Sequence, residues 1–197
     1  KVTIFFGVPT LYAAMLNSKL KPEDYKSLRL SVSAGEALPE HLCKNWNKTI
    51  GTKVLDGIGS TEMLHIFISN YIDLITPGSS GKPVPGYEVR LMKEDNSEAD
   101  TNEIGELEVK GPTSAISYWN KPEKTKATFI GDWVKTGDKY TKDANGIYKY
   151  CGRADDMMKV SGQYVSPFEI EEALQSHKYV LEAAVVGKKD KDELVTD

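Results

Sequence analysis

The sequence predicts an α/β protein with three parts: part of a doubly wound parallel sheet, a small antiparallel β subdomain, and the start of an α+β C-terminal lid domain. Strand and helix patterns alternate over residues 1–76, which favours a parallel sheet. Glycine and proline interrupt short strand patterns over residues 77–152, which favours antiparallel pairing. A polar link at residues 153–157 then precedes a capped helix pattern and an apolar run within residues 158–197, which indicates a further domain.

The first part contains patterns for a strand, a helix and a second strand at residues 2–6, 10–18 and 28–33. Next comes a helix that should close at Gly51, because apolar side chains recur every fourth residue before it, at Leu38, Leu42, Trp46 and Ile50. A short strand is expected at residues 53–55. Ligands gather at the carboxyl ends of parallel strands, so residues 33–36 and 56–62 are expected to face one crevice.

The second part contains two short strand patterns and a hairpin, at residues 87–92, 105–111 and 139–150. Asn145 and Gly146 mark the turn of the hairpin. The segment at residues 77–86 is rich in glycine and serine like a phosphate loop, but its prolines remove amide donors and no helix pattern follows. We therefore interpret it as a structural loop.

The third part begins after the polar link. Ser166 and Glu169 flank Pro167 in the pattern of a capping box, so a helix is expected over residues 167–177. The apolar run at residues 182–187 predicts a strand. Together they predict the opening of a C-terminal domain.

The composition of the 197-residue chain, with 40% hydrophobic residues, suits a packed globular core. Its net charge of −4 comes from scattered charges of both signs, so neither nucleic acid nor an anionic membrane is an expected partner. No run approaches the roughly 20 apolar residues of a membrane span. Cys43 and Cys151 lack a metal-binding spacing, which fits a reducing cytoplasm. Because the chain opens on Lys1 without an initiator Met, we expect a piece of a longer protein.

The most informative stretch is Leu55–Phe67, in which two glycines precede Ser60, Thr61 and Glu62. A hydroxyl followed by a carboxylate can serve a phosphate and its metal ion, while glycine lets a backbone approach a ligand closely. The stretch is not a Walker loop, because no Gly-Lys pair in the sequence is followed by Ser or Thr. It is not a Rossmann fingerprint either, because Glu62 stands where that motif needs a small residue. An alternative interpretation is that Glu62 only caps or solvates the start of a helix.

The order of the motifs is more specific than any one of them. GVPT, SAGEALP, GIGSTE, GKPVPGYEV, GELEVKGP, TGD and GRADDMMKVSG follow one another along essentially the whole chain. Their spacing resembles that of the adenylate-forming superfamily of acyl-CoA ligases, adenylation domains and luciferases. Within it, STEMLHIFISN, YWNKPEKTKATF and DDMMKVSGQYVSPFEIE are most similar to the benzoate-CoA ligases.

The resemblance implies a two-step reaction that uses ATP, Mg²⁺ and coenzyme A. An aryl carboxylate attacks the α-phosphate of ATP to give an acyl-adenylate and pyrophosphate, and the thiol of coenzyme A then displaces AMP. Catalysis would be mostly electrostatic, because charge grows on phosphate oxygens. The phosphate-gripping loop and the catalytic lysine of the superfamily match nothing in this sequence, so the rest of a parent ligase chain is the expected partner.

The resemblance also assigns roles to residues of this chain. Thr61 would hydrogen-bond the α-phosphate and Glu62 would hold Mg²⁺. Asp138 would accept both ribose hydroxyls, although a turn-capping aspartate is the alternative. Arg153 would contact ribose or phosphate. The adenine would lie between two short segments, formed by Gly35, Glu36 and Ala37 and by Asp56, Gly57 and Ile58.

The C-terminal part would serve the second step. Asp155 falls at the superfamily's hinge, and Gly162 matches the glycine beside which the pantetheine arm passes. Lys159 is expected either to make a polar contact during thioester formation or to be a solvated lysine. Gln163 and Tyr164 depart from relatives that carry an arginine for the coenzyme A phosphate, which leaves that contact open.

The acyl group would occupy a flat, mostly apolar slot shaped by Ala34, Gly59, His65 and Ile66. His65 has the alternative interpretation of a packed core histidine. The leading hypothesis is a benzoate-activating ligase. An amino-acid adenylation domain would need an acid in the slot for the ammonium group, and none is evident near GVPT or SAGE. A non-catalytic nucleotide-binding module is the third possibility.

Overall fold

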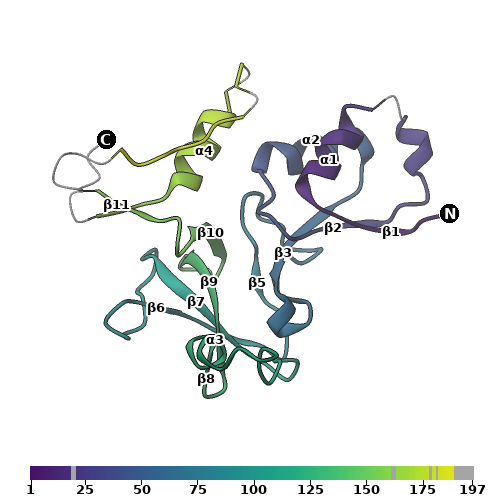
Figure 1. Cartoon of the computed structure of the whole chain (residues 1–197). Helices are drawn as coiled ribbons and strands as arrows, with labels where there is room; N and C mark the ends of the chain where they lie inside the picture. Colours follow the sequence, from purple (N-terminus) through teal and green to yellow (C-terminus); the bar gives the residue numbers. More distant parts are fainter. Residues whose placement is uncertain (19–20, 161–162, 178, 181, 189–197) are drawn as a thin grey trace.

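The computed structural model describes residues 1–18, 21–160, 163–177, 179–180 and 182–188. It contains a mixed five-stranded sheet, a second, antiparallel sheet and a C-terminal segment with one helix. The first sheet and its helices form the right half of Figure 1, and the second sheet lies at the lower left beneath the C-terminal helix. Within the described residues, no helix is long and apolar enough to cross a membrane.

The first sheet has the strand order β1-β2-β3-β4-β5, which follows the sequence. Its strands are β1 (Ile4–Gly7), β2 (Leu30–Ser33), β3 (Val54–Gly59), β4 (Ile66–Ser69) and β5 (Lys82–Pro83). β1, β2 and β3 pair in parallel, whereas β4 and β5 pair antiparallel. The α/β class predicted from the alternating patterns is therefore confirmed, with a mixed sheet.

Two helices cover one face of the parallel strands, α1 (Pro9–Leu16) and α2 (Glu40–Ile50). Two successive right-handed crossovers that advance in the same direction place their helices on the same face of a sheet. The helices accordingly share a core with Val54, built around Tyr12, Leu42 and Trp46. Gly51 closes α2 in the left-handed conformation at φ 82°, as the sequence predicted. A short 3₁₀ helix, η1 (Pro22–Tyr25), lies between α1 and β2.

Gly57 and Gly59 of the Leu55–Phe67 stretch lie inside a strand, which corrects the expected strand end at residue 55. β3 continues through Gly57 to Gly59 because it pairs with β4. A Cβ on Gly57 would lie 2.7 Å from the carbonyl oxygen of Ile68, and one on Gly59 would lie 2.5 Å from that of His65. The close approach of β4 therefore requires both glycines. η2 (Thr61–Met63) forms the turn between the two strands.

The second sheet confirms the predicted antiparallel subdomain. Its strand order is β10-β9-β7-β6, with β8 paired to β9. The strands are β6 (Glu88–Met92), β7 (Gly105–Lys110), β8 (Phe129–Ile130), β9 (Trp133–Lys142) and β10 (Tyr148–Arg153), and α3 (Pro122–Thr128) precedes β8. β9 and β10 form the predicted hairpin around Asn145 and Gly146.

One core joins the two sheets. Met63, Phe67 and Ile68 from the β3–β4 region pack in the same buried cluster as side chains of the second sheet, namely Leu91, Leu107, Val109, Val134 and Tyr140. Buried apolar contacts of this kind are the main stabilising term in a fold. The end of β3 is therefore held from both sheets.

The C-terminal segment contains a strand pair, β11 (Met158–Val160) with β12 (Gln163–Val165), followed by α4 (Pro167–Gln175). The Ser166 hydroxyl accepts a hydrogen bond from the Glu169 amide at 3.1 Å, so the predicted N-cap is confirmed. The strand predicted at residues 182–187 is wrong. The described residues of that run have no regular structure, because no neighbouring strand pairs with them.

Candidate functional site

The segment after β2 lies against the ends of both neighbouring strands. The Ala34 amide donates to the Gly7 carbonyl at 3.3 Å, and the Leu38 amide donates to Oδ2 of Asp56 at 3.4 Å. Gly35 has φ +95°, a conformation that favours glycine. The predicted adenine-flanking segments, residues 35–37 and 56–58, are thus joined at the carboxyl ends of β2 and β3.

Asp56 is a buried carboxyl group at this junction, with 7% of its surface exposed. Burial raises the pKa of Asp56 to about 7, although hydrogen bonds from the amides of Leu38 and Gly57 oppose the increase. Within the described residues its Oδ1 has no hydrogen-bond partner. The side chain of Asn70 donates to the Asp56 carbonyl at 3.3 Å. The backbone of Asp56 is thus held by Asn70, and its carboxyl group by the Leu38 amide.

Thr61 and Glu62 form the single turn of η2, directly after β3. Leu64 closes this turn with φ 75°, an unfavourable conformation for leucine that costs on the order of 1–3 kcal/mol. The Thr61 side chain is exposed, whereas the next residue but one, Met63, is fully buried. Burial of Met63 therefore anchors the turn that carries the predicted phosphate and metal residues.

The carboxylate of Glu62 has a partner that sequence reasoning missed. The Tyr118 hydroxyl donates to Oε1 of Glu62 at 2.5 Å across 56 positions of sequence. Partial burial alone would raise the pKa of Glu62, but hydrogen bonds led by that from Tyr118, together with the charge of Lys124, hold the pKa below its usual value. No spacing rule links residues so far apart, so the sequence offered no signal for this contact.

The donor set at Glu62 fits magnesium held mainly by a nucleotide. Among the residues that the structure describes, no three His, Cys, Asp or Glu side chains gather as a metal cage. Mg²⁺ is usually bound through one or two carboxylates together with substrate phosphates and water. An ionised Glu62 beside the exposed Thr61 hydroxyl supplies the protein part of such a site.

Asp138, predicted to contact the ribose, and Arg153, predicted to contact ribose or phosphate, lie opposite each other on β9 and β10. Nη1 of Arg153 lies 3.0 Å from Oδ1 of Asp138 and also donates to the Thr136 carbonyl. Burial raises the pKa of Asp138 despite the opposing charge of Arg153. A Cβ on Gly137 would lie 2.7 Å from the guanidinium, so glycine at this position leaves room for the ion pair.

The predicted hinge follows this ion pair directly. The Ala154 amide donates to the Gly137 carbonyl at 2.8 Å, and the exposed Asp155 comes next in the chain. Lys159 lies in β11, but its side chain lies outside the described part of the chain, as does the whole of Gly162. Asp155, the predicted hinge residue, therefore lies close in the chain to Asp138's partner Arg153, and the structure gives no account of the predicted pantetheine contact.

Three of the four residues predicted for the acyl slot lie around the turn between β3 and β4. Gly59 pairs with Ile66 across the β3–β4 turn, and His65 precedes Ile66. His65 is exposed, with its ring 6.3 Å from that of Tyr87. The alternative interpretation of His65 as a packed core histidine is therefore wrong. Ala34 lies at the neighbouring end of β2 and is half-buried.

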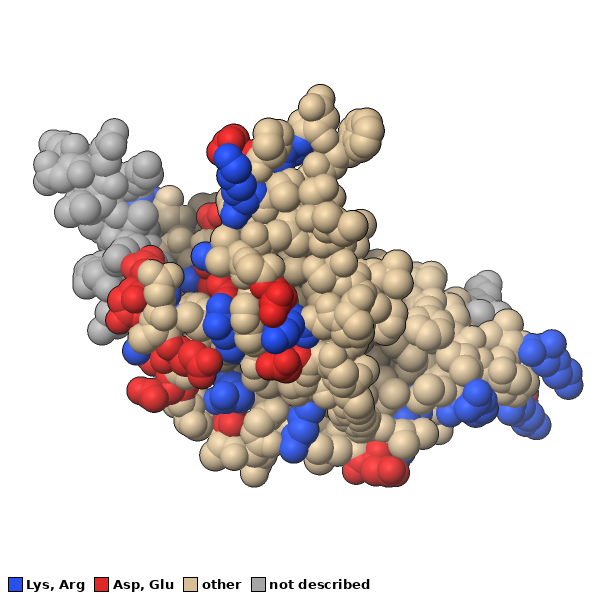
Figure 2. Space-filling view, turned by 90° about the horizontal axis from the view of Figure 1, so that it is seen from below, with Lys and Arg blue, Asp and Glu red and all other residues tan. Residues whose placement is uncertain are grey.

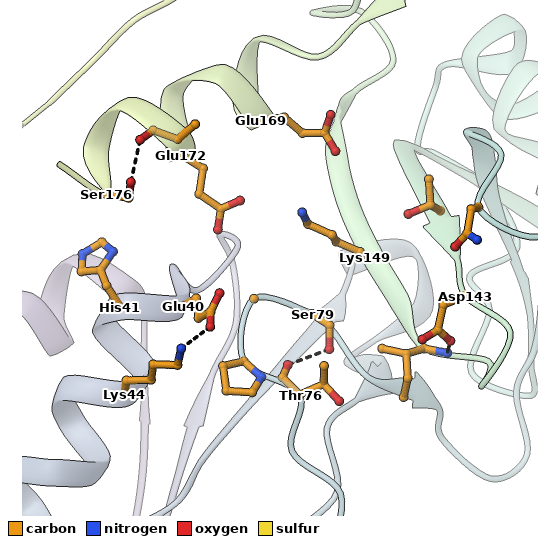
Figure 3. Close-up of a pocket in the computed structure, with 16 residues that line it drawn as sticks. Glu40, His41, Lys44, Thr76, Ser79, Asp143, Lys149, Glu169, Glu172 and Ser176 are labelled. Atoms are coloured by element: carbon orange, nitrogen blue, oxygen red, sulfur yellow. Dashed lines mark hydrogen bonds and ion pairs between the residues drawn. The ribbon is translucent and has the colours of Figure 1, made fainter.

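A cleft of about 680 Å³ lies away from all these residues. Figure 3 shows Glu172 of α4 and Ser176, which directly follows that helix, opposite Glu40, His41 and Lys44 of α2, with Lys149 of β10 to one side. Glu40 and Lys44 form an ion pair. None of the predicted nucleotide or acyl residues lines this cleft. It separates the C-terminal helix from the first sheet.

The surface charges agree with the prediction from composition. On the face shown in Figure 2, Lys and Arg alternate with Asp and Glu, and neither sign forms a continuous stripe. Ion pairs of opposite charge, such as Lys110 with Glu88 and with Asp132, account for part of this mixture. Charges of opposite sign thus lie close together on this face.

Comparison with known proteins gives a consistent result. A family model described as AMP-binding enzyme matches residues 1–119. The chain is 57% identical over 194 residues to a benzoate–CoA ligase of Thauera aromatica, covering 98% of this chain and 37% of that relative. A crystal structure of a benzoate CoA ligase from Burkholderia xenovorans LB400 matches with a TM-score of 0.90 and 50% identity, over 98% of this chain and 39% of that one.

Two similar structures were solved with ligands. An anthranilate CoA ligase in complex with anthranoyl-AMP matches with a TM-score of 0.91 and 49% identity, over 98% of this chain and 38% of that one. An O-succinylbenzoate coenzyme A synthetase from Bacillus subtilis, in complex with ATP and magnesium ion, matches with a TM-score of 0.84 and 31% identity. The match covers 96% of this chain and 40% of that one. This chain thus spans well under half the length of each protein that it matches here.

Proposed function

Because the chain belongs to the AMP-binding enzyme family, we propose that it forms part of an ATP-dependent aryl carboxylate–CoA ligase whose substrate is benzoate. The overall reaction is benzoate plus ATP plus coenzyme A to benzoyl-CoA, AMP and pyrophosphate. The observation that carries this proposal is the 57% identity to a benzoate–CoA ligase over 98% of the chain. The remainder of the active site would come from the part of such a ligase that this chain does not span.

In the first half-reaction a benzoate oxygen attacks the α-phosphorus of ATP. The bond to the bridging oxygen of the β-phosphate breaks, and pyrophosphate leaves with the electron pair. Bound magnesium would offset the negative charge that develops on the phosphate oxygens. Glu62 would hold that ion with its ionised carboxylate, and the Thr61 hydroxyl would donate to an α-phosphate oxygen.

The nucleoside would be held by the strand ends described above. Residues 35–37 and 56–58 would flank the adenine, while Asp138 would accept hydrogen bonds from the ribose hydroxyls. Arg153 would remain beside Asp138 and add a contact to ribose or phosphate. The 3.0 Å pairing of these two side chains supports the idea that they act on the same part of the nucleotide.

In the second half-reaction the thiol of coenzyme A attacks the acyl carbon. The bond from that carbon to the phosphate oxygen breaks, AMP leaves, and the thiol proton is released. Asp155 would be the pivot about which residues 158–197 rotate between the two steps. Lys159 would contact the complex in the thioester-forming orientation, and Gly162 would leave space for the pantetheine arm.

The choice of benzoate is also consistent with the proposed slot, which Ala34, Gly59, His65 and Ile66 would shape. A planar ring gains most from burial between flat, mostly apolar walls, and small residues keep such a slot narrow. An amino-acid adenylation domain is less well supported, because its slot would need a carboxylate for the substrate ammonium group.

The proposed organisation assigns residues 1–76 to the end of the α/β part of the large domain and residues 77–152 to its β-rich subdomain. Residues 153–157 would be the hinge, and residues 158–197 would begin the mobile C-terminal domain. We also propose a cytoplasmic location, since ATP and coenzyme A are the substrates. None of the partners in this scheme is a nucleic acid or a membrane.

The test is benzoate-dependent exchange of pyrophosphate into ATP, measured on a ligase-length protein that contains this chain. Glu62→Gln keeps the side-chain shape but removes the charge, so exchange should fall by about 10² or more. Glu123→Gln, the same change on the exposed start of α3, is the matched control and should leave exchange unchanged. A loss below about threefold in Glu62→Gln would assign Glu62 a structural role, and absence of benzoate-dependent exchange in the unchanged protein would refute the proposal.

A further inference from the structure

The loop between β7 and α3, residues 111–121, lies across the turn that carries Glu62. The Ala115 amide donates to the Glu62 carbonyl at 2.7 Å, and the Thr113 hydroxyl donates to the Met63 carbonyl at 2.6 Å. The Tyr118 hydroxyl then reaches the Glu62 side chain. One loop from the second sheet therefore contacts both the backbone and the carboxylate of the candidate metal residue.

Tyr118 is held in place from several directions. Its amide donates to the Thr125 hydroxyl at 3.0 Å. Its ring and that of Phe129 form a T-shaped pair with their centroids 5.4 Å apart. The Lys124 ammonium lies 4.8 Å from the ring centroid, within the range of a cation–π contact. α3 and β8 thus fix the orientation of the hydroxyl before any ligand is present.

The neighbours of Tyr118 behave differently, which shows that the loop as a whole is not simply packed inward. Ile116 is 94% exposed and Trp119 is 95% exposed. Of Ile116, Tyr118 and Trp119, only Tyr118 points toward η2, the turn between β3 and β4. Its direction is therefore set by specific contacts with Glu62, Thr125 and Phe129.

We propose that Tyr118 is a positioning residue for Glu62: its hydroxyl occupies Oε1 and orients the carboxylate so that Oε2 faces the metal of the bound nucleotide. This inference rests on the proposed function, because it presumes that Glu62 is the magnesium residue. A free carboxylate side chain must lose rotamer freedom when it binds an ion. A preformed hydrogen bond removes part of that cost and fixes which oxygen is available.

The competing explanation is that Tyr118 only anchors the loop. The structure supplies a matched control for this, since the Tyr87 hydroxyl hydrogen-bonds the Thr113 hydroxyl of the same loop at 2.8 Å without touching Glu62. Tyr118→Phe and Tyr87→Phe therefore remove the same atom and one loop contact each. Only Tyr118→Phe removes a partner of the carboxylate.

The experiment measures Mn²⁺ binding, by electron paramagnetic resonance, in the presence of α,β-methylene ATP in the ligase-length protein. Loss of an outer partner of a metal ligand typically costs 10–100-fold in metal affinity, so Tyr118→Phe should weaken Mn²⁺ by about that factor. Tyr87→Phe should stay within about threefold of the unchanged protein. Equal weakening in both variants would mean that loop anchoring explains the effect, and no weakening in Tyr118→Phe would also overturn the proposal.

A double-mutant cycle separates this inference from the proposed function. If Tyr118 acts through Glu62, adding Tyr118→Phe to Glu62→Gln should produce almost no further loss of Mn²⁺ affinity. Additive losses would show that Tyr118 acts independently of Glu62. A protein that binds Mn²⁺ with the nucleotide but shows no benzoate-dependent exchange would refute the proposed substrate while leaving the role of Tyr118 standing.

Discussion

Replacing Asp56 with asparagine should change how the stability of this chain depends on pH. Burial raises the pKa of Asp56 to about 7 in the folded chain, whereas an aspartate in an unfolded chain titrates near ~3.9. Between these values the folded state keeps a proton that the unfolded state has released. The free energy of unfolding therefore falls as the pH rises from about 4 to about 7, and it is constant outside that window as far as Asp56 is concerned.

The size of the effect follows from the difference between the two pKa values. About three pKa units at roughly 1.4 kcal/mol each give a loss of about 4 kcal/mol across the window. This is a large part of the roughly 5–15 kcal/mol that stabilises a typical domain. Asparagine cannot ionise, so Asp56→Asn removes the pH-dependent loss of stability. The side-chain oxygen of the asparagine can still accept a hydrogen bond from the Leu38 amide.

The assay is urea unfolding of the chain at pH values from about 4 to about 8, with and without the substitution. Other carboxylates titrate in both proteins, so the informative quantity is the difference between the two free energies of unfolding. As the pH rises across the series, the free energy of unfolding of Asp56→Asn should increase by about 4 kcal/mol relative to that of the unchanged chain. Asp73→Asn, the same change at an exposed site, should give a profile parallel to that of the unchanged chain. Parallel profiles for Asp56→Asn as well would refute the reasoning.

Three further substitutions test other parts of the structure. Gly59→Ala should lower the free energy of unfolding by about 1–3 kcal/mol, because its Cβ would lie 2.5 Å from the His65 carbonyl oxygen; unchanged urea stability would contradict the close strand approach. In the ligase-length protein, Ala34→Leu should abolish benzoate-dependent exchange while ATP still binds, and normal benzoate turnover would remove Ala34 from the slot. Asp155→Pro fixes φ near −65° at the pivot, so pyrophosphate exchange should persist while benzoyl-CoA formation falls steeply; equal loss of both in folded protein would mean that Asp155 is not the pivot.

Local sequence patterns predicted the elements whose causes are local. The helix that ends at Gly51 needs only its own apolar spacing and a residue that accepts positive φ. The Ser166 cap and the hairpin at Asn145 and Gly146 are likewise decided within a few residues. These elements occur where they were expected.

The errors arose where a distant segment decides the structure. The apolar run at residues 182–187 has the composition of a strand, but a strand also needs a neighbour with which to pair. Gly57 and Gly59 were predicted from the approach of a ligand, and the structure adds a second reason for them, the close approach of the β4 backbone. The partner of Glu62 stayed hidden because Tyr118 lies in a loop of the second sheet.

The candidate metal site therefore depends on both sheets, although its predicted residues come from the first. Met63, next to Glu62, is fully buried in the core that it shares with Leu107 and Val109 of β7. The loop that leaves β7 then supplies Tyr118 to the Glu62 carboxylate. Packing fixes the backbone of the turn, and a hydrogen bond fixes the Glu62 side chain. If Glu62 holds magnesium as proposed, a change in the antiparallel subdomain would alter metal binding without touching a predicted site residue. Variation in residues 111–121 is accordingly the first place to look when two such ligases with the same site motif differ in their requirement for magnesium.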